Sequence, residues 1–302
     1  MTGSHPSGDL FAPAPAGQPL ASVRFAVLDV ESTGLESDDR VLEFACLLTQ
    51  GPVPFDEFQT LVNPERMIPE EVVRIHGINQ EAVAKARRFY EIFPRVDGML
   101  RGSVIVAHNA GFDLGFLRNE WKILGKRLAQ PPVVDTLQLA RNLMVQERYA
   151  LDALADALSL PHRPSHRALE DARATHDLFW RLLDEAPAPV RTLEDVLALH
   201  VPPEVGWEEA AAEGAVREVH KPLQEALLRG TSLSIAYLGR SGESIRVVTP
   251  ERLERSAGRI YLRARTGGEG TSRPFRMDRI LSVFPPGSAG PPAPPGAAGS
   301  RP

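Results

Sequence analysis

The chain has 302 residues, 43% hydrophobic and 24% charged, with a net charge of −5 at pH 7, which is typical of a globular protein long enough for two domains. No apolar run approaches the roughly 20 residues of a spanning helix, so the composition excludes a membrane-spanning protein. The single cysteine, Cys46, excludes an internal disulfide, and the N-terminus lacks a secretion-signal pattern, so we expect a cytoplasmic location.

Charge is distributed unevenly along the chain. Residues 1–216 hold 20 Lys and Arg against 32 Asp and Glu, a net charge of −12, whereas residues 217–284 hold 13 against 7, a net charge of +6. An acidic part can collect divalent cations and a basic part can hold phosphates, although two solvated surfaces would give the same counts.

Proline, glycine and alanine dominate residues 1–21 and 285–302, which we expect to be disordered. Between 22 and 184, short apolar runs predict strands and periodic apolar positions predict helices. The strands are expected at 23–29, 41–48, 55–62, 104–107 and 133–134, and the helices at 69–75, 80–87, 91–100, 113–124, 137–144, 151–158 and 168–183. This order predicts an α/β domain around a mixed sheet.

The rest of the chain predicts a linker and a smaller domain. Residues 185–216 mix Pro and Ala with one short helix, for which Thr192 and Asp195 have the spacing of an N-terminal cap. Residues 217–284 predict one helix followed by short strands separated by Gly-rich turns, which indicates a small β-barrel or sheet. The helix is expected at 218–229 and the strands at 233–237, 244–249, 259–265 and 272–277.

Acidic residues follow the predicted strands and begin the predicted helices. Asp29 and Glu31 end the first strand, where residues two apart share one face and their carboxylates repel each other unless a cation neutralises them. Asp113 begins the helix after strand 104–107, where an N-terminal cap is an equally good explanation. His166 precedes the last helix, and Asp171 lies one turn inside it.

Each of these features alone is compatible with an ordinary surface, but their combination predicts a site. Four carboxylates from three separate strand or helix ends can hold two hard cations about 4 Å apart, which bind the attacking and leaving oxygens of a phosphoryl displacement. A histidine with a pKa near neutrality can take the proton from the attacking water.

The three acidic segments resemble the three motifs of the DEDDh exonucleases, the family that contains the epsilon proofreading subunit of bacterial DNA polymerase III. The resemblance covers about residues 22–183 in order and spacing. The motifs are Asp29, Glu31, Thr33 and Gly34; then His108, Asn109, Phe112 and Asp113; then His166, Ala168, Leu169, Asp171 and Ala172. Further matches are Asn63-Pro64, 75–78 and 134–137.

The resemblance implies a ribonuclease-H-like fold and 3′-to-5′ hydrolysis that releases nucleoside 5′-monophosphates. It implies that two divalent cations, Mg²⁺ or Mn²⁺, are held by the four carboxylates and that His166 is the general base. It also implies contacts with a single-stranded 3′ end, with DNA favoured over RNA, although both occur in the family. The residues expected to contact the substrate are Thr33, Gly34, His108, Asn109 and Phe112.

Residues 221–284 resemble a WYL domain, a small SH3-like β-barrel of bacterial regulators that is associated with nucleic-acid or nucleotide ligands. The matching residues include Tyr237, 246–250, 261–262 and 273–280, whereas Ile260 replaces the signature tryptophan. Arginines that alternate along strands can grip phosphates and tyrosines can stack on bases, unless these tyrosines are core and the arginines only solubilise. The candidates are Tyr237, Arg246, Tyr261, Arg263, Arg276 and Arg279.

Two other functions remain open from the sequence. The chain could be a catalytically silent regulator that binds nucleic acid through the WYL-like domain, or an enzyme that a nucleotide or oligonucleotide on that domain gates. The presence of all four carboxylates and His166 argues against silence. Residues 35–55 carry no obvious partner-binding peptide, and the sequence leaves protein partners unknown.

Overall fold

The computed structural model describes residues 17–36, 38–239, 242–266 and 271–286. Most of the two terminal segments predicted to be disordered therefore lies outside the described residues. The chain divides into two compact units between Val201 and Pro202. Among the described residues, no helix is long and apolar enough to cross a membrane. The cytoplasmic location stays a prediction.

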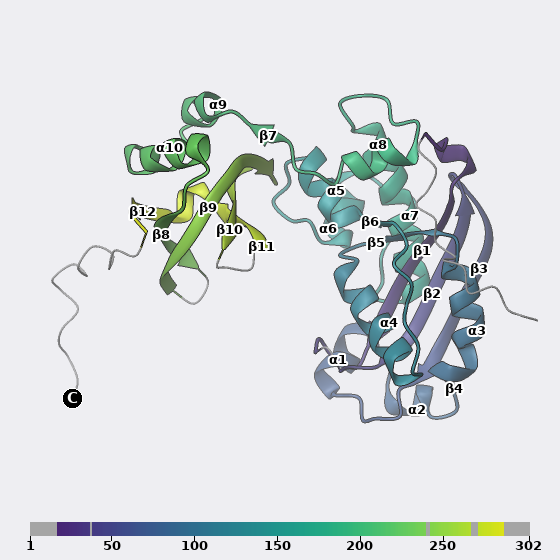
Figure 1. Ribbon diagram of the computed structural model, residues 1–302. Coiled ribbons are helices and arrows are strands. Elements are labelled where there is room, and N and C mark those ends of the chain that lie inside the picture. Colours follow the sequence, from purple (N-terminus) through teal and green to yellow (C-terminus); the bar gives the residue numbers. More distant parts are fainter. Residues whose placement is uncertain (1–16, 37, 240–241, 267–270, 287–302) are drawn as a thin grey trace, which may run out of the picture. The chain divides into compact units, whose positions relative to one another are not determined.

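The first unit is built on a six-stranded sheet with the strand order β4-β3-β2-β1-β5-β6 (Figure 1). β1 lies in its middle, antiparallel to β2 and parallel to β5, so the predicted mixed α/β sheet is confirmed. The strands are β1 (Arg24–Ser32), β2 (Val41–Gln50), β3 (Val53–Asn63), β4 (Arg87–Arg88), β5 (Val104–Ala107) and β6 (Val133–Asp135).

Helices cover both faces of this sheet, and the alternation of β1 assigns its side chains to them. Ala26 and Leu28 pack with α3 and α4 in one core, whereas Phe25 and Val27 pack with α5 to α8 in the other. The helices are α1 (Glu70–His76), α2 (Gln80–Val83), α3 (Phe89–Leu100), α4 (Gly111–Ile123), α5 (Thr136–Leu143), α6 (Leu151–Ala157), α7 (Ala168–Asp184) and α8 (Leu193–Ala198).

One predicted helix of the first unit is too long. The helix expected at 80–87 begins at Gln80, where the Asn79 side chain accepts a hydrogen bond from the Ala82 backbone, but it ends at Val83. Arg87 and Arg88 instead form β4, which pairs with the end of β3. Pairing at a sheet edge has overridden a helical pattern here.

The stretch predicted as a linker is divided between the two units. Thr192 and Asp195 form the expected capping box of α8, and Leu193 and Val196 of this helix are buried in the first unit. β7 (Glu204–Val205) and α9 (Trp207–Ala212) belong to the second unit, where Ala210 is buried.

The second unit is an antiparallel sheet with the order β11-β10-β9-β8-β12, and β7 pairs with β9. The long strand β9 pairs with β8 through its first half and with β10 through its second. No pairing among the described residues closes this sheet, so the SH3-like barrel is not confirmed. Its elements are η2 (Glu218–His220), α10 (Lys221–Arg229), β8 (Leu233–Gly239), β9 (Gly242–Ser256), β10 (Arg259–Thr266), β11 (Thr271–Arg276), η3 (Met277–Arg279) and β12 (Ile280–Phe284).

Candidate active site

Asp29 and Glu31 lie on the face of β1 that α7 covers. They continue the row of Phe25 and Val27, whose side chains pack in the core beneath α7, because residues two apart on a strand share a face. Both acids are half-buried. The strand therefore delivers two carboxylates to the place where its apolar row ends.

Asp171 completes a group that could hold a metal ion. It is buried in the first turn of α7, and its carboxylate lies within 4.8 Å of ligand atoms of Asp29 and Glu31. Carboxylate oxygens are the ligands that Mg²⁺ and Mn²⁺ prefer, so the donor set fits a hard divalent cation.

Asp113 approaches the same group from α4, on the other helical layer. It is buried in the first turn of this helix, and hydrogen bonds from the backbone amides of Val30 and Asp113 itself reach its carboxylate. Among charged groups, Asp113 has the largest effect on the pKa of Asp29, which it raises by repulsion. The structure thus brings Asp29, Glu31 and Asp171 within ligand distance of one another, and Asp113 acts on Asp29 electrostatically from the other helical layer.

Burial and mutual repulsion disfavour the charged forms of these four groups. Burial, followed by repulsion from Asp113 and Asp171, raises the pKa of Asp29 well above its ordinary value. Burial and neighbouring carboxylates raise the pKa of Glu31 to about 7, and burial raises the pKa of Asp113 to about 8. The pKa of Asp171 is raised by burial as well. Cations at this site would stabilise four negative charges that the protein alone stabilises poorly.

His166 lies in the loop before α7, close enough to Asp171 to lower the pKa of that carboxyl group. Its side chain is exposed, and its backbone has a φ of 56°, a left-handed conformation that is uncommon for a residue other than glycine. The preceding amide, Ser165 N, donates a 2.8 Å hydrogen bond to Asp171 Oδ1. The loop is therefore attached to one of the carboxylates beside which His166 lies.

Glu43 and Arg167 are two charged residues near the site that the sequence analysis missed. Glu43 lies on β2 directly opposite Glu31 and is 1% exposed. Arg167 donates to it through Nε at 3.1 Å and through a terminal nitrogen at 2.8 Å. The available signal was a glutamate inside the apolar run 41–48, where the predicted strand offers no polar face.

The residues of the first motif shape the loop after β1. Thr33 is 1% exposed, and its hydroxyl donates a 2.6 Å hydrogen bond to Asp39 and accepts one from Arg40 N. Gly34 is required by space, because a Cβ there would lie 2.3 Å from the Asp39 carboxylate. The Thr33 hydroxyl is thus occupied within the loop, and its predicted contact with substrate stays a prediction.

The residues of the second motif separate into buried and exposed ones. His108 bridges the Thr136 hydroxyl at 3.0 Å and the Tyr149 carbonyl at 2.9 Å, so both of its ring nitrogens are occupied. Asn109 and Phe112 are exposed, with Phe112 at 48%. Asn109 and Phe112 are therefore better placed than His108 for a contact with substrate.

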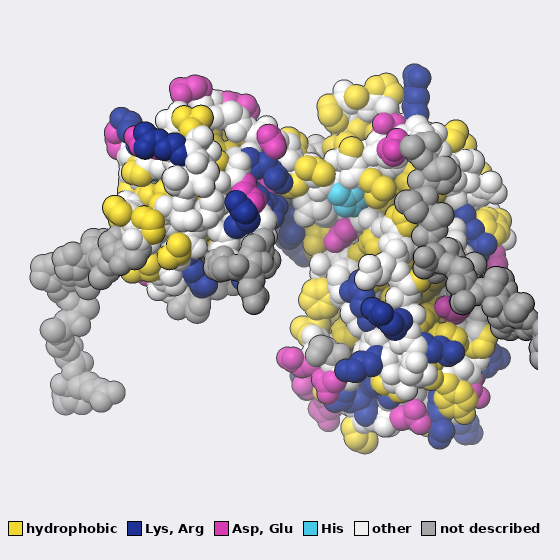
Figure 2. Space-filling view, viewed as in Figure 1, with side chains coloured by type: hydrophobic (Ala, Val, Ile, Leu, Met, Phe, Trp, Pro, Cys, Tyr) yellow, Lys and Arg dark blue, Asp and Glu magenta, His cyan; other side chains and the backbone are white. Residues whose placement is uncertain are grey.

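The surface of α4 beyond Asp113 is basic. Arg118 and Lys122 are exposed on this helix, and Lys126 and Arg127 are exposed in the turn that follows. Figure 2 shows Lys and Arg side chains gathered over α4 on the visible face of the first unit. A net negative charge of residues 1–216 therefore does not exclude a local surface that attracts phosphates.

In the second unit, the predicted ligand residues are not equally free. Arg263 forms an ion pair with the buried Glu254, and Arg276 forms one with Asp278. Arg279 and Tyr261 are half-buried. Tyr237 and Arg246 instead line a cavity of about 330 Å³, in which the Arg246 Nε donates to Ser244.

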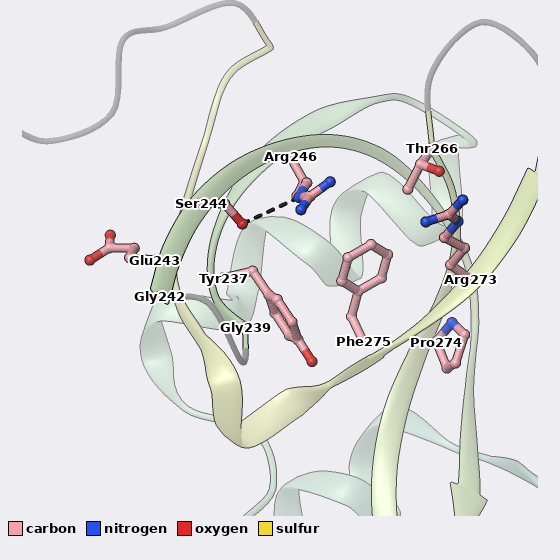
Figure 3. A pocket seen from close by; sticks show the side chains of 10 residues that line it. All are labelled: Tyr237, Gly239, Gly242, Glu243, Ser244, Arg246, Thr266, Arg273, Pro274 and Phe275. Carbon is pink, nitrogen blue, oxygen red and sulfur yellow. Dashed lines mark hydrogen bonds between the residues drawn. The ribbon is translucent and has the colours of Figure 1, made fainter. Parts of the chain in front are cut away.

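This cavity has an aromatic floor and two guanidinium groups. Tyr237 and Phe275 pack edge to face with ring centroids 5.2 Å apart. Figure 3 shows the Phe275 ring between the side chains of Arg246 and Arg273, and both arginines are exposed. Arg273 was not among the predicted residues, although its place on a strand of the resembling segment 273–280 was a signal.

Both units match known protein families. A family model described as Exonuclease matches residues 26–179, about half of the chain, and one described as WYL domain matches residues 218–285. The PolC-type DNA polymerase III of Thermotoga maritima is 40% identical over 163 residues, which cover 53% of this chain and 12% of that protein. The DNA polymerase III subunit epsilon-like protein of Rhodobacter capsulatus is 38% identical over 175 residues, which cover 56% of this chain and 25% of that protein.

Solved structures share the fold. A zinc-bound complex of E. coli exonuclease I with single-stranded DNA matches with a TM-score of 0.54 and 18% identity, covering 76% of this chain and 51% of that chain. An exonuclease I from Methylocaldum szegediense matches with a TM-score of 0.50 and 17% identity, covering 87% and 65%. The predicted ribonuclease-H-like exonuclease fold of the first unit is confirmed.

The raised pKa values predict how stability depends on pH without metal. A carboxyl group whose pKa is higher in the folded chain binds more protons there, so it lowers the free energy of unfolding as pH rises from its unfolded pKa to its folded pKa. For Asp113 this window runs from 3.8 to about 8. We expect Asp113→Asn to melt higher than the parent in EDTA, by a difference that grows from pH 4 to pH 8 and reaches about 5 °C.

Thermal melts of the two proteins across this pH range provide the measurement. Mn²⁺ should narrow the difference, because it raises the Tm of the parent more than that of the variant, which keeps the carboxylates of Asp29, Glu31 and Asp171. The exposed Asp152→Asn serves as the control and should melt like the parent at every pH. A pH-independent difference for Asp113→Asn would contradict the assignment of the carboxylate cluster.

Proposed function

The chain belongs to the exonuclease family, and we propose that it hydrolyses phosphodiester bonds of a nucleic acid from the 3′ end and releases nucleoside 5′-monophosphates. The observation that carries this proposal is the cluster of Asp29, Glu31, Asp113 and Asp171 beside an exposed His166. Four carboxyl groups with raised pKa values in one place destabilise the folded chain, and such clusters are typical of functional sites.

Asp29, Glu31 and Asp171 would hold one divalent cation, and Asp113 would contribute to a second through its proximity to Asp29. Two such cations, Mg²⁺ or Mn²⁺, would neutralise charge on the attacking and leaving oxygens when bound. Because the four carboxylates come from β1, α4 and α7, the sheet and the helical layers on its two faces fix their spacing before any ligand arrives.

His166 would act as the general base. Its exposed ring can accept a proton from a water molecule whose oxygen attacks the terminal phosphorus. The bond from this phosphorus to the O3′ of the preceding nucleotide breaks, and O3′ then takes a proton from solvent. The phosphate stays on the released nucleotide, which leaves as a 5′-monophosphate.

A single-stranded 3′ end of DNA is the proposed substrate. Its phosphates would be attracted to the exposed Arg118 and Lys122 of α4, and its terminal nucleotide would contact the exposed Asn109 and Phe112. The preference for DNA over RNA rests on two similar proteins, the PolC-type and the epsilon-like protein, whose names are those of DNA polymerase III.

We further propose that the second unit binds a nucleotide or a nucleic-acid strand in the cavity of Arg246, Arg273 and Tyr237. Guanidinium groups pair with phosphates, and aromatic rings stack on bases. The arginines whose guanidinium groups are paired, Arg263 and Arg276, are poorer candidates because a phosphate would have to displace Glu254 or Asp278.

The alternative, a silent or ligand-gated regulator, differs from the proposal in one observable. A silent protein would bind single-stranded nucleic acid with metal present and leave it intact. A gated enzyme would shorten it only when the second unit is occupied, so removing the cavity arginines would change the rate as well as the affinity.

The first test is hydrolysis itself. We expect 5′-labelled single-stranded DNA to be shortened stepwise in Mg²⁺ or Mn²⁺, and matched RNA more slowly. Asp171→Asn should lower the rate at least a thousandfold, because it removes one of the three carboxylates that lie together. EDTA should abolish the reaction. Intact substrate after long incubation, with binding retained, would favour the silent regulator.

The second test concerns the cavity. Arg246→Ala with Arg273→Ala should weaken binding of single-stranded DNA about tenfold at low salt and flatten its dependence on salt concentration. Arg259→Ala with Arg265→Ala removes the same charge from residues that do not line the cavity, and it should change affinity less. Equal losses in the two double variants would show that only net charge matters.

A further inference from the structure

Glu43 is a charged residue in a strand whose neighbours are all apolar. The other residues of β2 from Val41 to Leu48 are hydrophobic and buried, and Glu43 is buried among them. Burying a carboxylate costs free energy that a hydrophobic residue of similar size would not cost. Glu43 also lies directly opposite Glu31, so its negative charge adds to that of the carboxylate cluster and destabilises the cation-free fold further unless something compensates.

The carboxylate of Glu43 accepts most of its hydrogen bonds from residues at the start of α7. It accepts from Nε and a terminal nitrogen of Arg167, and its Oε2 accepts from Ala168 N at 3.1 Å. A fourth bond comes from Gln59 Nε2 at 2.8 Å. Burial would raise the pKa of Glu43, but these hydrogen bonds outweigh it and hold the pKa below its ordinary value.

His166 is fixed between two attached neighbours. On one side, Ser165 N is bound to Asp171, and on the other, Arg167 and Ala168 are bound to Glu43. The left-handed backbone of His166 is unfavourable for a residue with a Cβ and persists only where its surroundings determine it. Arg167 is the N-cap residue of α7, but its side chain makes no capping hydrogen bond to the helix. Its guanidinium group is hydrogen-bonded to Glu43 instead.

We propose that Glu43 and Arg167 are positioning residues that hold His166 in place for the hydrolysis proposed above, on which this inference rests. Glu43 is too deeply buried to touch substrate. The Arg167 guanidinium lies 2.8 Å from the Glu43 carboxylate, so it offsets that buried negative charge, and the same ion pair orients the residue next to the base.

A double-mutant cycle distinguishes positioning from plain stability. Arg167→Ala should lower the single-turnover rate about tenfold in the parent chain and less than twofold in the His166→Ala chain, because a residue that acts through His166 loses its effect with it. The KM and the affinity for Mn²⁺ should change by less than twofold. The conservative Arg167→Lys should recover part of the rate.

Arg173→Ala is the matched control. Arg173 lies on α7, which begins directly after Arg167, and it pairs with Glu57 and Glu170, so its removal deletes a nearby paired arginine without touching residues 165–168. It should leave the rate unchanged. Equal losses from Arg167→Ala in the presence and absence of His166 would overturn the proposal, because the residue would then act directly or through stability.

Hydrogen exchange gives a readout that needs no activity. In the metal-free protein, Arg167→Ala should speed amide exchange in the segment 164–169 and leave the rest of the first unit unchanged, whereas Arg173→Ala should not affect this segment. Faster exchange in a protein that does not cut nucleic acid would support the positioning role of Glu43 and Arg167 and contradict the proposed hydrolysis. Unchanged exchange in an active enzyme would contradict the positioning role alone.

Discussion

Repulsion among four carboxylates is the constraint on which the rest of the first unit depends. β1 must bring Asp29 and Glu31 to the end of its apolar row, and the first turns of α4 and α7 must bring Asp113 and Asp171 beside them. Charged groups in this arrangement destabilise the folded chain, as the raised pKa of each one indicates. The two apolar cores on either side of β1 must therefore supply the stability that the site removes.

The positions of two of the carboxylates in the fold reduce this repulsion. Asp113 and Asp171 occupy first turns of helices, where the helix dipole and free backbone amides favour a negative charge. Backbone amides reach both carboxylates, from Val30 in one case and Ser165 in the other. The same amide that stabilises Asp171 also attaches the loop of His166, so the proposed metal site and the proposed base are parts of one hydrogen-bonded structure.

Local sequence patterns were enough to predict where the acidic residues lie on their strands and helices. They were not enough to predict the contact between Glu43 and Arg167. Asp29 and Glu31 could be placed on one face because a strand has a period of two, and Asp113 because an acid after a strand begins a helix. Glu43 lies 124 residues before Arg167, and no local pattern connects them. The helix expected over 80–87 was too long for a similar reason, since its last residues pair with a distant strand.

Composition was a poor guide to the second unit because charges there are partly used internally. Its surplus of arginine suggested a phosphate-binding face, but Arg263 lies against the buried Glu254, and Arg276 against Asp278. An arginine already held by a carboxylate offers little to a phosphate, since the new ion pair must replace an existing one. Arg246 and Arg273 differ because they border a cavity with aromatic walls. The shape of the surface, and not the number of charges, decides which arginines can bind a ligand.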